Sequence, residues 1–330
     1  MFYRMQLDVI IGRDSMGFTY ESVKSLLSKF SEIEKNRAAL TKLKIILDVE
    51  PSQFNELGAA FLWRFARHQQ SLKCEKEIRY SERILPLLEN RHFLDRLTGK
   101  TTKTFSESVP IHYESFRPLR IGAKEKGFKS VEDVYNDAIK TTLDKKNDFQ
   151  REFGIHILEV INNTFDHSES ENEAGIVCVK DNQMMTVCAV DMGQGIRKSF
   201  LTNPSLRDEY LRVPEEKIIE RASNFRTSCN PSSDRHPKYG STANGGIGLY
   251  FLKEFIKLHK ESQLIIVSGK GYYYVDGTGR EKIKNLKEYG WPGTLVYFRT
   301  NVSQAANPEY KNLTQKYLVE SGALVEDLEG

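Results

Sequence analysis

Apolar and polar positions alternate with two different periods near the N-terminus, which predicts strands followed by helices. Residues 43–49 (LKIILDV) form a short apolar run that is typical of a buried strand. Residues 54–67 (FNELGAAFLWRFAR) follow with apolar positions at helical spacing. Residues 76–80 and 81–97 repeat this order, and Pro86 interrupts the second predicted helix. This part of the chain therefore predicts an α/β unit.

A polar stretch at residues 98–108, rich in Gly, Thr, Ser and Lys, separates this unit from the rest. The whole chain has 330 residues, and domains usually hold ~100–200 residues, so we expect two domains. We place the boundary between residues 98 and 130, and assign residues 1–120 to the first domain and 121–330 to the second.

The second part of the chain shows longer helical and strand patterns. Residues 130–167 predict two helices, the second beginning near Glu152. Residues 174–180 (AGIVCVK) and 184–193 (MMTVCAVDMG) read as a β-hairpin, because both are apolar and a short polar connection joins them. Residues 245–260 (GGIGLYFLKEFIKLHK) predict a helix that begins at glycines. Further strands are predicted at residues 264–268, 271–276 and 294–300.

Helices beside a largely antiparallel sheet, without regular βαβ alternation, indicate an α+β domain of two layers. Between the predicted hairpin and the glycine-led helix lies the segment 199–244, which is long, polar and partly basic. Unstructured loops of this length are usually functional lids or disordered.

Composition and charge exclude several classes of function. Charged residues make up 28% and hydrophobic residues 39%, as in a soluble globular protein, and the net charge of +3 gives no evidence for a nucleic acid or an anionic membrane as partner. Apolar runs are too short for a signal peptide or for a membrane span of ~20 residues, so we expect a cytoplasmic protein. The cysteines form no CxxC pair, which argues against a zinc site or a disulfide framework.

One face of the predicted helix that ends near residue 167 carries a polar stripe. Steps of about 100° per residue place Glu159, Asn163 and Asp166 together at i, i+4 and i+7. The apolar residues fall on the opposite side: Phe153, Ile157, Ile161 and Phe165. Taken alone, such a stripe is more often a solvated helix face than a site.

Glycine-rich motifs follow. Asp191-Met-Gly193-Gln-Gly195 puts a carboxylate at a strand end, and glycines where the backbone turns tightly or approaches a ligand. A plain glycine turn explains this motif equally well. Residues 276–279 (DGTG) look similar but have a different spacing, so we discount them. Residues 244–249 (NGGIGL) open a helix, where backbone N–H groups and the helix dipole favour phosphate.

In this order EVINNTFDH, DMGQG, NGGIGL and GT resemble the N, G1, G2 and G3 boxes of the GHKL superfamily, which includes gyrase, heat-shock chaperones, histidine kinases and MutL. Each motif is weak alone, but their order and intervals together are specific. The resemblance covers roughly residues 130–302. It implies a two-layer α/β sandwich of the Bergerat type, ATP and Mg²⁺ as cofactors, and an ATP lid at about residues 199–244.

The resemblance also implies a role for each matching residue. Glu159 would orient or deprotonate the attacking water, and Asn163 would ligate Mg²⁺ through its side-chain oxygen. Asp191 would accept the exocyclic amino hydrogen of adenine, which selects adenine over guanine. Further nucleotide-binding positions are implied at Asp166, Gly193, Gly195, Gly245, Gly246, Ile247, Gly248, Leu249 and Thr294. Lys238 of the lid is a candidate for the γ-phosphate, although basic loop residues are more often simply solvated.

Several functions stay open. The residues Glu159 and Asp166 resemble those of hydrolysing members, which favours a slow ATPase that acts as a nucleotide-controlled switch. Anti-sigma-factor serine kinases also carry a glutamate at the first position, so a protein kinase of that or the histidine-kinase type is the alternative, and a non-hydrolysing ATP sensor is a third. Residues 43–67 loosely resemble the opening of a STAS-type domain. We therefore expect a bacterial regulatory protein with a protein partner, and a homodimer fits the same reading.

Overall fold

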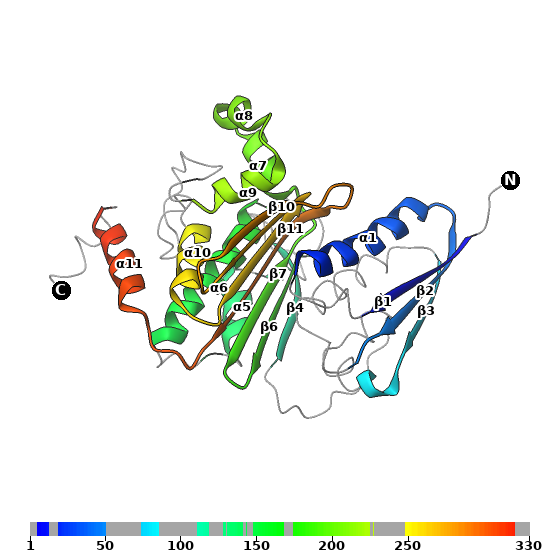
Figure 1. Ribbon diagram of the computed structural model, residues 1–330, viewed down its shortest axis with the longest axis horizontal. Coiled ribbons are helices and arrows are strands. Elements are labelled where there is room, and N and C mark those ends of the chain that lie inside the picture. Colours follow the sequence, from blue (N-terminus) through cyan, green and yellow to red (C-terminus); the bar gives the residue numbers. More distant parts are fainter. Residues whose placement is uncertain are drawn as a thin grey trace.

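Two β-sheets organise the part of the chain that the structure describes (Figure 1). This computed structural model describes residues 5–12, 19–50, 74–85, 111–118, 128–129, 131–140, 143, 148–167, 174–224, 227 and 248–320. One sheet has three strands and the other has eight, with helices beside both, so the fold is mixed α+β.

The smaller sheet is parallel and comes from the N-terminal part. Its strands are β1 (Met5–Gly12), β2 (Leu40–Asp48) and β3 (Glu75–Tyr80), in that order. Helix α1 (Tyr20–Asn36) connects β1 to β2, and the side chain of Thr19 caps it by accepting a hydrogen bond from the Ser22 amide at 3.2 Å. The strands predicted at residues 43–49 and 76–80 are confirmed. The helix predicted at residues 54–67 lies outside the described residues.

The larger sheet has the strand order β10-β9-β8-β11-β7-β6-β4-β5. Its strands are β4 (Ile111–Pro118), β5 (Phe128–Lys129), β6 (Ala174–Asp181), β7 (Met184–Val190), β8 (Gln263–Gly269), β9 (Gly271–Asp276), β10 (Glu281–Asn285) and β11 (Trp291–Asn301). Neighbouring strands are antiparallel except for β4 and β5, which confirms a largely antiparallel sheet. Strand β4 precedes residue 121, where we expected the second domain to begin, yet it pairs with β6 of this sheet.

Helices cover one face of the larger sheet. They are α5 (Val131–Lys140), α6 (Asp148–His167) and α10 (Gly248–Leu258). Helix α11 (Pro308–Glu320) packs against α6 and α10 through Tyr310. Phe153 of α6 and Phe255 of α10 are fully buried there, and Phe153 lies edge-on to Phe298 of β11 with ring centroids 5.2 Å apart. Phe153, Ile157 and Ile161 of the predicted apolar side of α6 thus form part of the core, and the Phe165 side chain lies outside the described residues.

The opposite face of the larger sheet packs against α1, which shares a buried cluster with the smaller sheet. Val9 of β1 and Leu27 of α1 belong to one buried cluster with Tyr272 and Trp291 of the larger sheet. Both faces of the larger sheet are therefore covered. Residues 174–179 of β6 are all buried, which explains why this strand reads as an unbroken apolar run.

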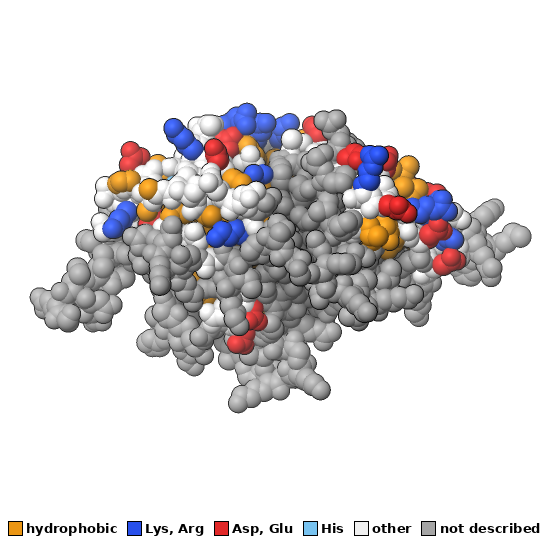
Figure 2. Space-filling view, turned by 90° about the horizontal axis from the view of Figure 1, so that it is seen from below, with side chains coloured by type: hydrophobic (Ala, Val, Ile, Leu, Met, Phe, Trp, Pro, Cys, Tyr) orange, Lys and Arg blue, Asp and Glu red, His pale blue; other side chains and the backbone are white. Residues whose placement is uncertain are grey.

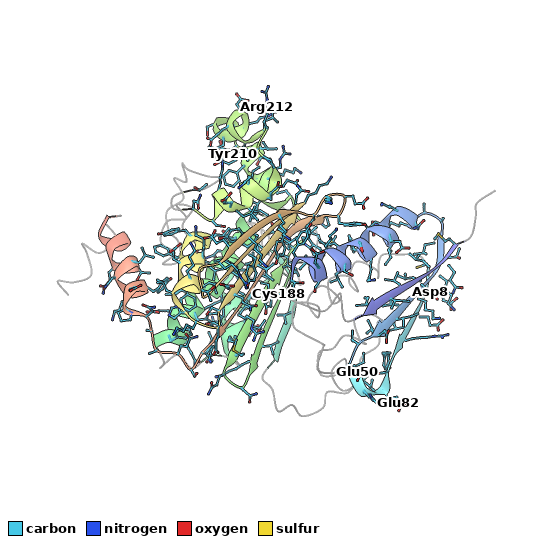
Figure 3. All side chains as sticks on the ribbon, viewed as in Figure 1. Asp8, Glu50, Glu82, Cys188, Tyr210 and Arg212 are labelled. Carbon is cyan, nitrogen blue, oxygen red and sulfur yellow. The ribbon has the colours of Figure 1, made fainter. Side chains whose placement is uncertain are left out.

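The segment 199–244, expected to be one long loop, is helical in its first half. Helices α7 (Gly195–Thr202), α8 (Pro204–Tyr210) and α9 (Glu215–Ala222) follow one another and enclose a small apolar cluster. Asn203 caps α8 by accepting from the Ser205 amide at 2.9 Å, and the helices are too short to show a clear helical period in the sequence. The buried side chain of Tyr210 lies at the end of α8, in the part that projects from the sheets (Figures 1 and 3).

No helix in the described ranges is long and apolar enough to cross a membrane.

Candidate functional site

Helix α6 carries two residues of the predicted polar stripe, Glu159 and Asn163, beside its buried apolar side. Glu159 and Asn163 are partly buried, whereas Ile157 and Ile161 are fully buried. The helix begins at Asp148, slightly earlier than expected, and continues to His167. Nothing is described of the Asp166 side chain. Within the described residues, α6 therefore places Glu159 and Asn163 one turn apart at the edge of the core.

The first residue of α10 lies directly against Glu159. A Cβ atom at Gly248 would lie 2.6 Å from Glu159 Oε2 and 3.3 Å from Glu159 Cβ, so a side chain there would collide with the carboxylate. Glycine thus allows the N-terminus of α10 to approach the acidic side of α6. The structure brings together two residues that the sequence predicted for one site. Other predicted positions, Lys238, Gly245, Gly246 and Ile247, lie outside the described residues.

Asp191 directly follows the central strand β7 and is 4% exposed. Its Oδ1 accepts hydrogen bonds from the Gly193 amide at 2.8 Å and from the Thr294 amide at 3.3 Å. The Asp191 amide in turn donates to the Thr294 carbonyl at 2.9 Å. Neighbouring strands β7 and β11 thus bring the predicted base acceptor and the predicted threonine into contact, and backbone N–H groups fix the carboxylate.

A serine that the sequence analysis did not single out joins these elements. Ser268 of β8 accepts a hydrogen bond from the Ile196 amide at 2.8 Å and donates one to the Gly293 carbonyl at 3.0 Å. Gly195 has φ +72°, and a Cβ atom there would lie 2.9 Å from the Ser268 hydroxyl. The glycine therefore permits both the turn after Asp191 and the close approach of this serine. The only signal in the sequence is a serine at the end of an apolar strand.

Trp291 is a second residue that the sequence analysis missed. Its indole Nε1 donates a hydrogen bond to the Asp191 carbonyl at 2.8 Å, and its side chain is 2% exposed. Gly293 lies against the same aspartate, because a Cβ atom there would be 2.7 Å from Asp191 Oδ1. The start of β11 thus surrounds Asp191 from several sides.

The two groups of residues border the same region of the fold. Helix α7 begins at Gly195, directly after the Asp191 turn, and contacts α6. Ile196 of α7 and Leu249 of α10 each contact two apolar clusters. One is the core between the larger sheet and helices α5, α6 and α10, and the other is the small cluster of α7 to α9. Leu249 is partly buried, so it contributes packing at this place. The helix pair with Glu159 and the turn with Asp191 are therefore adjacent.

A metal ion at this place would take few protein ligands. Among the described residues, no three side chains of His, Cys, Asp or Glu gather as a metal site. Mg²⁺ commonly keeps several waters and takes phosphate oxygens, so a single amide such as Asn163 can suffice on the protein side. Asn163 is partly buried and is the described residue whose side-chain oxygen could serve such an ion.

Comparison with protein-family models gives no match for this chain, and comparison with curated proteins gives no significant match.

Proposed function

We propose that the chain is a GHKL-type ATPase that binds ATP with Mg²⁺ and hydrolyses it slowly as a regulatory switch. The observation that carries this proposal is the meeting of residues from separate stretches of the chain. Glu159 lies against Gly248, and Asp191 lies against Gly193 and Thr294. A largely antiparallel sheet with α6 and α10 on one face supports the same assignment.

Asp191 is suited to recognise adenine. Hydrogen bonds from Gly193 and Thr294 hold its Oδ1, so the carboxylate keeps one orientation. A fixed, buried acceptor favours the exocyclic amino group of adenine and opposes the oxygen that guanine carries at that position. We therefore propose that Asp191 selects ATP over GTP.

The contact between α6 and α10 is suited to the triphosphate. Helix α10 begins at Gly248, and a helix N-terminus attracts phosphate through its N–H groups and its dipole. Asn163 would hold Mg²⁺, which supplies neutralisation of phosphate charge when it is bound. Glu159 lies one turn before Asn163 and would orient water toward the γ-phosphorus.

A protein kinase and a non-hydrolysing ATP sensor are the alternatives. Glu159 favours hydrolysis because a carboxylate beside the phosphate site accepts a proton from water. The same carboxylate could instead activate a protein hydroxyl, so the products must decide between these functions.

A substitution that keeps the shape of Glu159 tests the reaction. We expect Glu159→Gln to lower the release of labelled γ-phosphate by ~10²–10⁴-fold while ATP affinity stays the same, because the amide cannot act as a base. Glu152→Gln, earlier on α6, is the matched control and should keep wild-type turnover. If the labelled phosphate is found on a Ser, Thr or His of this chain or of a copurified protein, the function is that of a kinase and not an ATPase. ATP binding without either product would leave a nucleotide sensor.

A protein is the partner that we propose for the switch. On the face visible in Figure 2, the described Lys and Arg side chains are interspersed with Asp and Glu, and the net charge of the chain is +3. Proteins that bind nucleic acid usually cluster their cations on one surface. The mixed charge therefore gives no reason to propose a nucleic acid, and a homodimer is a second assembly that the proposal allows.

A further inference from the structure

Strands β1 to β3 and helix α1 form an N-terminal unit. This unit packs on the face of the larger sheet opposite α6 and α10, and Asp191, the residue proposed to bind adenine, lies at the end of a strand of that sheet. Figure 1 shows α1 between the two sheets. Near its start, the Tyr20 hydroxyl donates to the Asn285 carbonyl at 2.8 Å, and the Tyr20 ring lies edge-on to Tyr272 at 5.4 Å. Further along α1, the Phe30 ring lies 6.0 Å from Trp291. A continuous apolar core thus joins the unit to the sheet.

Trp291 connects α1 to Asp191. Its ring contacts Phe30, and its Nε1 donates to the Asp191 carbonyl at 2.8 Å. A buried indole N–H needs an acceptor, and here the acceptor belongs to the residue that would recognise adenine. Movement of Phe30 would therefore reach the backbone of Asp191 through one rigid side chain.

An irregularity in β11 explains why two of its residues reach the same aspartate. The pairing of β11 with β8 shifts register between Trp291 and Thr294. Such bulges re-aim side chains and are common next to sites. Here Thr294 contacts the amide and Oδ1 of Asp191, while Trp291 contacts its carbonyl. The position of Asp191 thus depends on both ends of the irregular stretch.

We infer that Trp291 is a positioning residue for base recognition, and that the seating of α1 through Phe30 is linked to ATP affinity. The inference rests on the proposed function and deepens it, because it names how the N-terminal unit would regulate the site. Linkage is reciprocal: if seated α1 strengthens ATP binding, then ATP stabilises the seating of α1 by the same factor.

Calorimetry with Mg-ATP on the full chain tests the first half of the inference. Trp291→Phe keeps an aromatic ring beside Phe30 but removes the N–H donor, and we expect it to raise the Kd for ATP about tenfold. Phe30→Leu keeps that hydrogen bond and loosens the ring contact, so we expect about a threefold rise. Ile265→Ala removes volume from the same buried cluster without touching Asp191, and its Kd should match the wild type.

Hydrogen exchange of α1 tests whether ATP stabilises the seating of α1. If Trp291 only stabilised the fold, ATP would not change the exchange rate of the α1 amides. In the wild type, saturating ATP should slow amide exchange in α1, and Trp291→Phe should abolish that difference. If Trp291→Phe does not fold, the ATP affinity of Phe30→Leu and the effect of ATP on hydrogen exchange in the wild type still test the inference. If Phe30→Leu and Ile265→Ala have equal ATP affinity, and ATP does not change the exchange of α1, the inference is wrong but the proposed function still stands. A wild-type protein that binds no ATP would overturn the proposed function and the inference together.

Discussion

Ser268 shows at the scale of single residues how the candidate site is held together. Its hydroxyl joins the turn after Asp191 to the start of β11 through the Ile196 amide and the Gly293 carbonyl. We expect Ser268→Ala to cost about 1–3 kcal/mol of unfolding free energy, because two buried backbone groups lose a partner. We also expect it to weaken ATP binding, since Ser268 would no longer join the Ile196 amide to the Gly293 carbonyl.

Ser262 is the matched control for this substitution. It is buried just before β8, and its hydroxyl hydrogen-bonds the Thr300 hydroxyl at 2.6 Å. Ser262 is thus at the opposite end of β8 from Ser268 and Thr294. Ser262→Ala should lower the free energy of unfolding in urea by a similar amount and leave ATP affinity unchanged. Equal losses of affinity in both variants would show that Ser268 acts only through global stability.

At the scale of elements, α6, α10 and α11 meet around buried histidines. The Tyr310 hydroxyl of α11 hydrogen-bonds His156 Nε2 of α6 at 2.9 Å, and His259 Nδ1, just after α10, lies 2.7 Å from the Phe255 carbonyl. Burial, and to a lesser degree the charge of His259, lowers the pKa of His156 from 6.5 to about 3. Burial lowers the pKa of His259 as well.

These shifts predict that stability falls as the pH falls. A histidine whose folded pKa lies below its unfolded pKa of 6.5 is protonated first in the unfolded chain, so its contribution is complete above pH 6.5 and is lost toward pH 3. Between pH 7.5 and 5.5, His156 alone should remove on the order of 1 kcal/mol of unfolding free energy. Urea unfolding at both pH values measures this loss, and His156→Gln should reduce it. A stability that does not change over this range would contradict the buried arrangement.

Long elements with one clear period could be predicted from the sequence, whereas short or context-dependent ones could not. Helices α6 and α10 and the β6–β7 hairpin were expected from their patterns, and the structure has them. Helices α7 to α9 were not expected, because Pro204 and Pro214 divide them into pieces shorter than a reliable pattern. Strand β1 and helix α1 are exceptions, because both were missed although each has a readable period: buried residues alternate along β1, and they recur at helical spacing along α1.

The candidate site divides in the same way. The motifs named Glu159 of α6 and Gly248 of α10 for one site, and the two residues lie against each other in the structure. Ser268 and Trp291 could not be predicted, because their contacts depend on which strands are neighbours and on the register shift in β11. A strand order of β8-β11-β7 places both beside Asp191, and the order of strands in space cannot be read from the order in the chain.

At the scale of the whole molecule, the larger sheet lies between the proposed ATP site and the proposed regulatory N-terminal unit. One face carries the helices beside Glu159 and Asp191, and the other face seats the N-terminal unit. Since β7 and β11 contribute side chains to both faces, a change on one side can reach the other through a single layer of strands. This arrangement suits a nucleotide-controlled regulatory protein.

Titration calorimetry with Mg-ATP and Mg-GTP, on the wild type and on Asp191→Asn, tests the central claim most directly. The wild type should bind ATP and reject GTP. Asp191→Asn should weaken ATP binding by about 1–3 kcal/mol, because the one remaining acceptor oxygen stays on the Gly193 and Thr294 amides and an NH2 donor then faces the adenine amino group. Asp276→Asn is the matched control, since Asp276 is also a buried aspartate in a glycine turn but lies in the motif that we discounted. It should bind ATP like the wild type. Equal affinity of the wild type for ATP and GTP, or unchanged ATP binding in Asp191→Asn, would contradict the account.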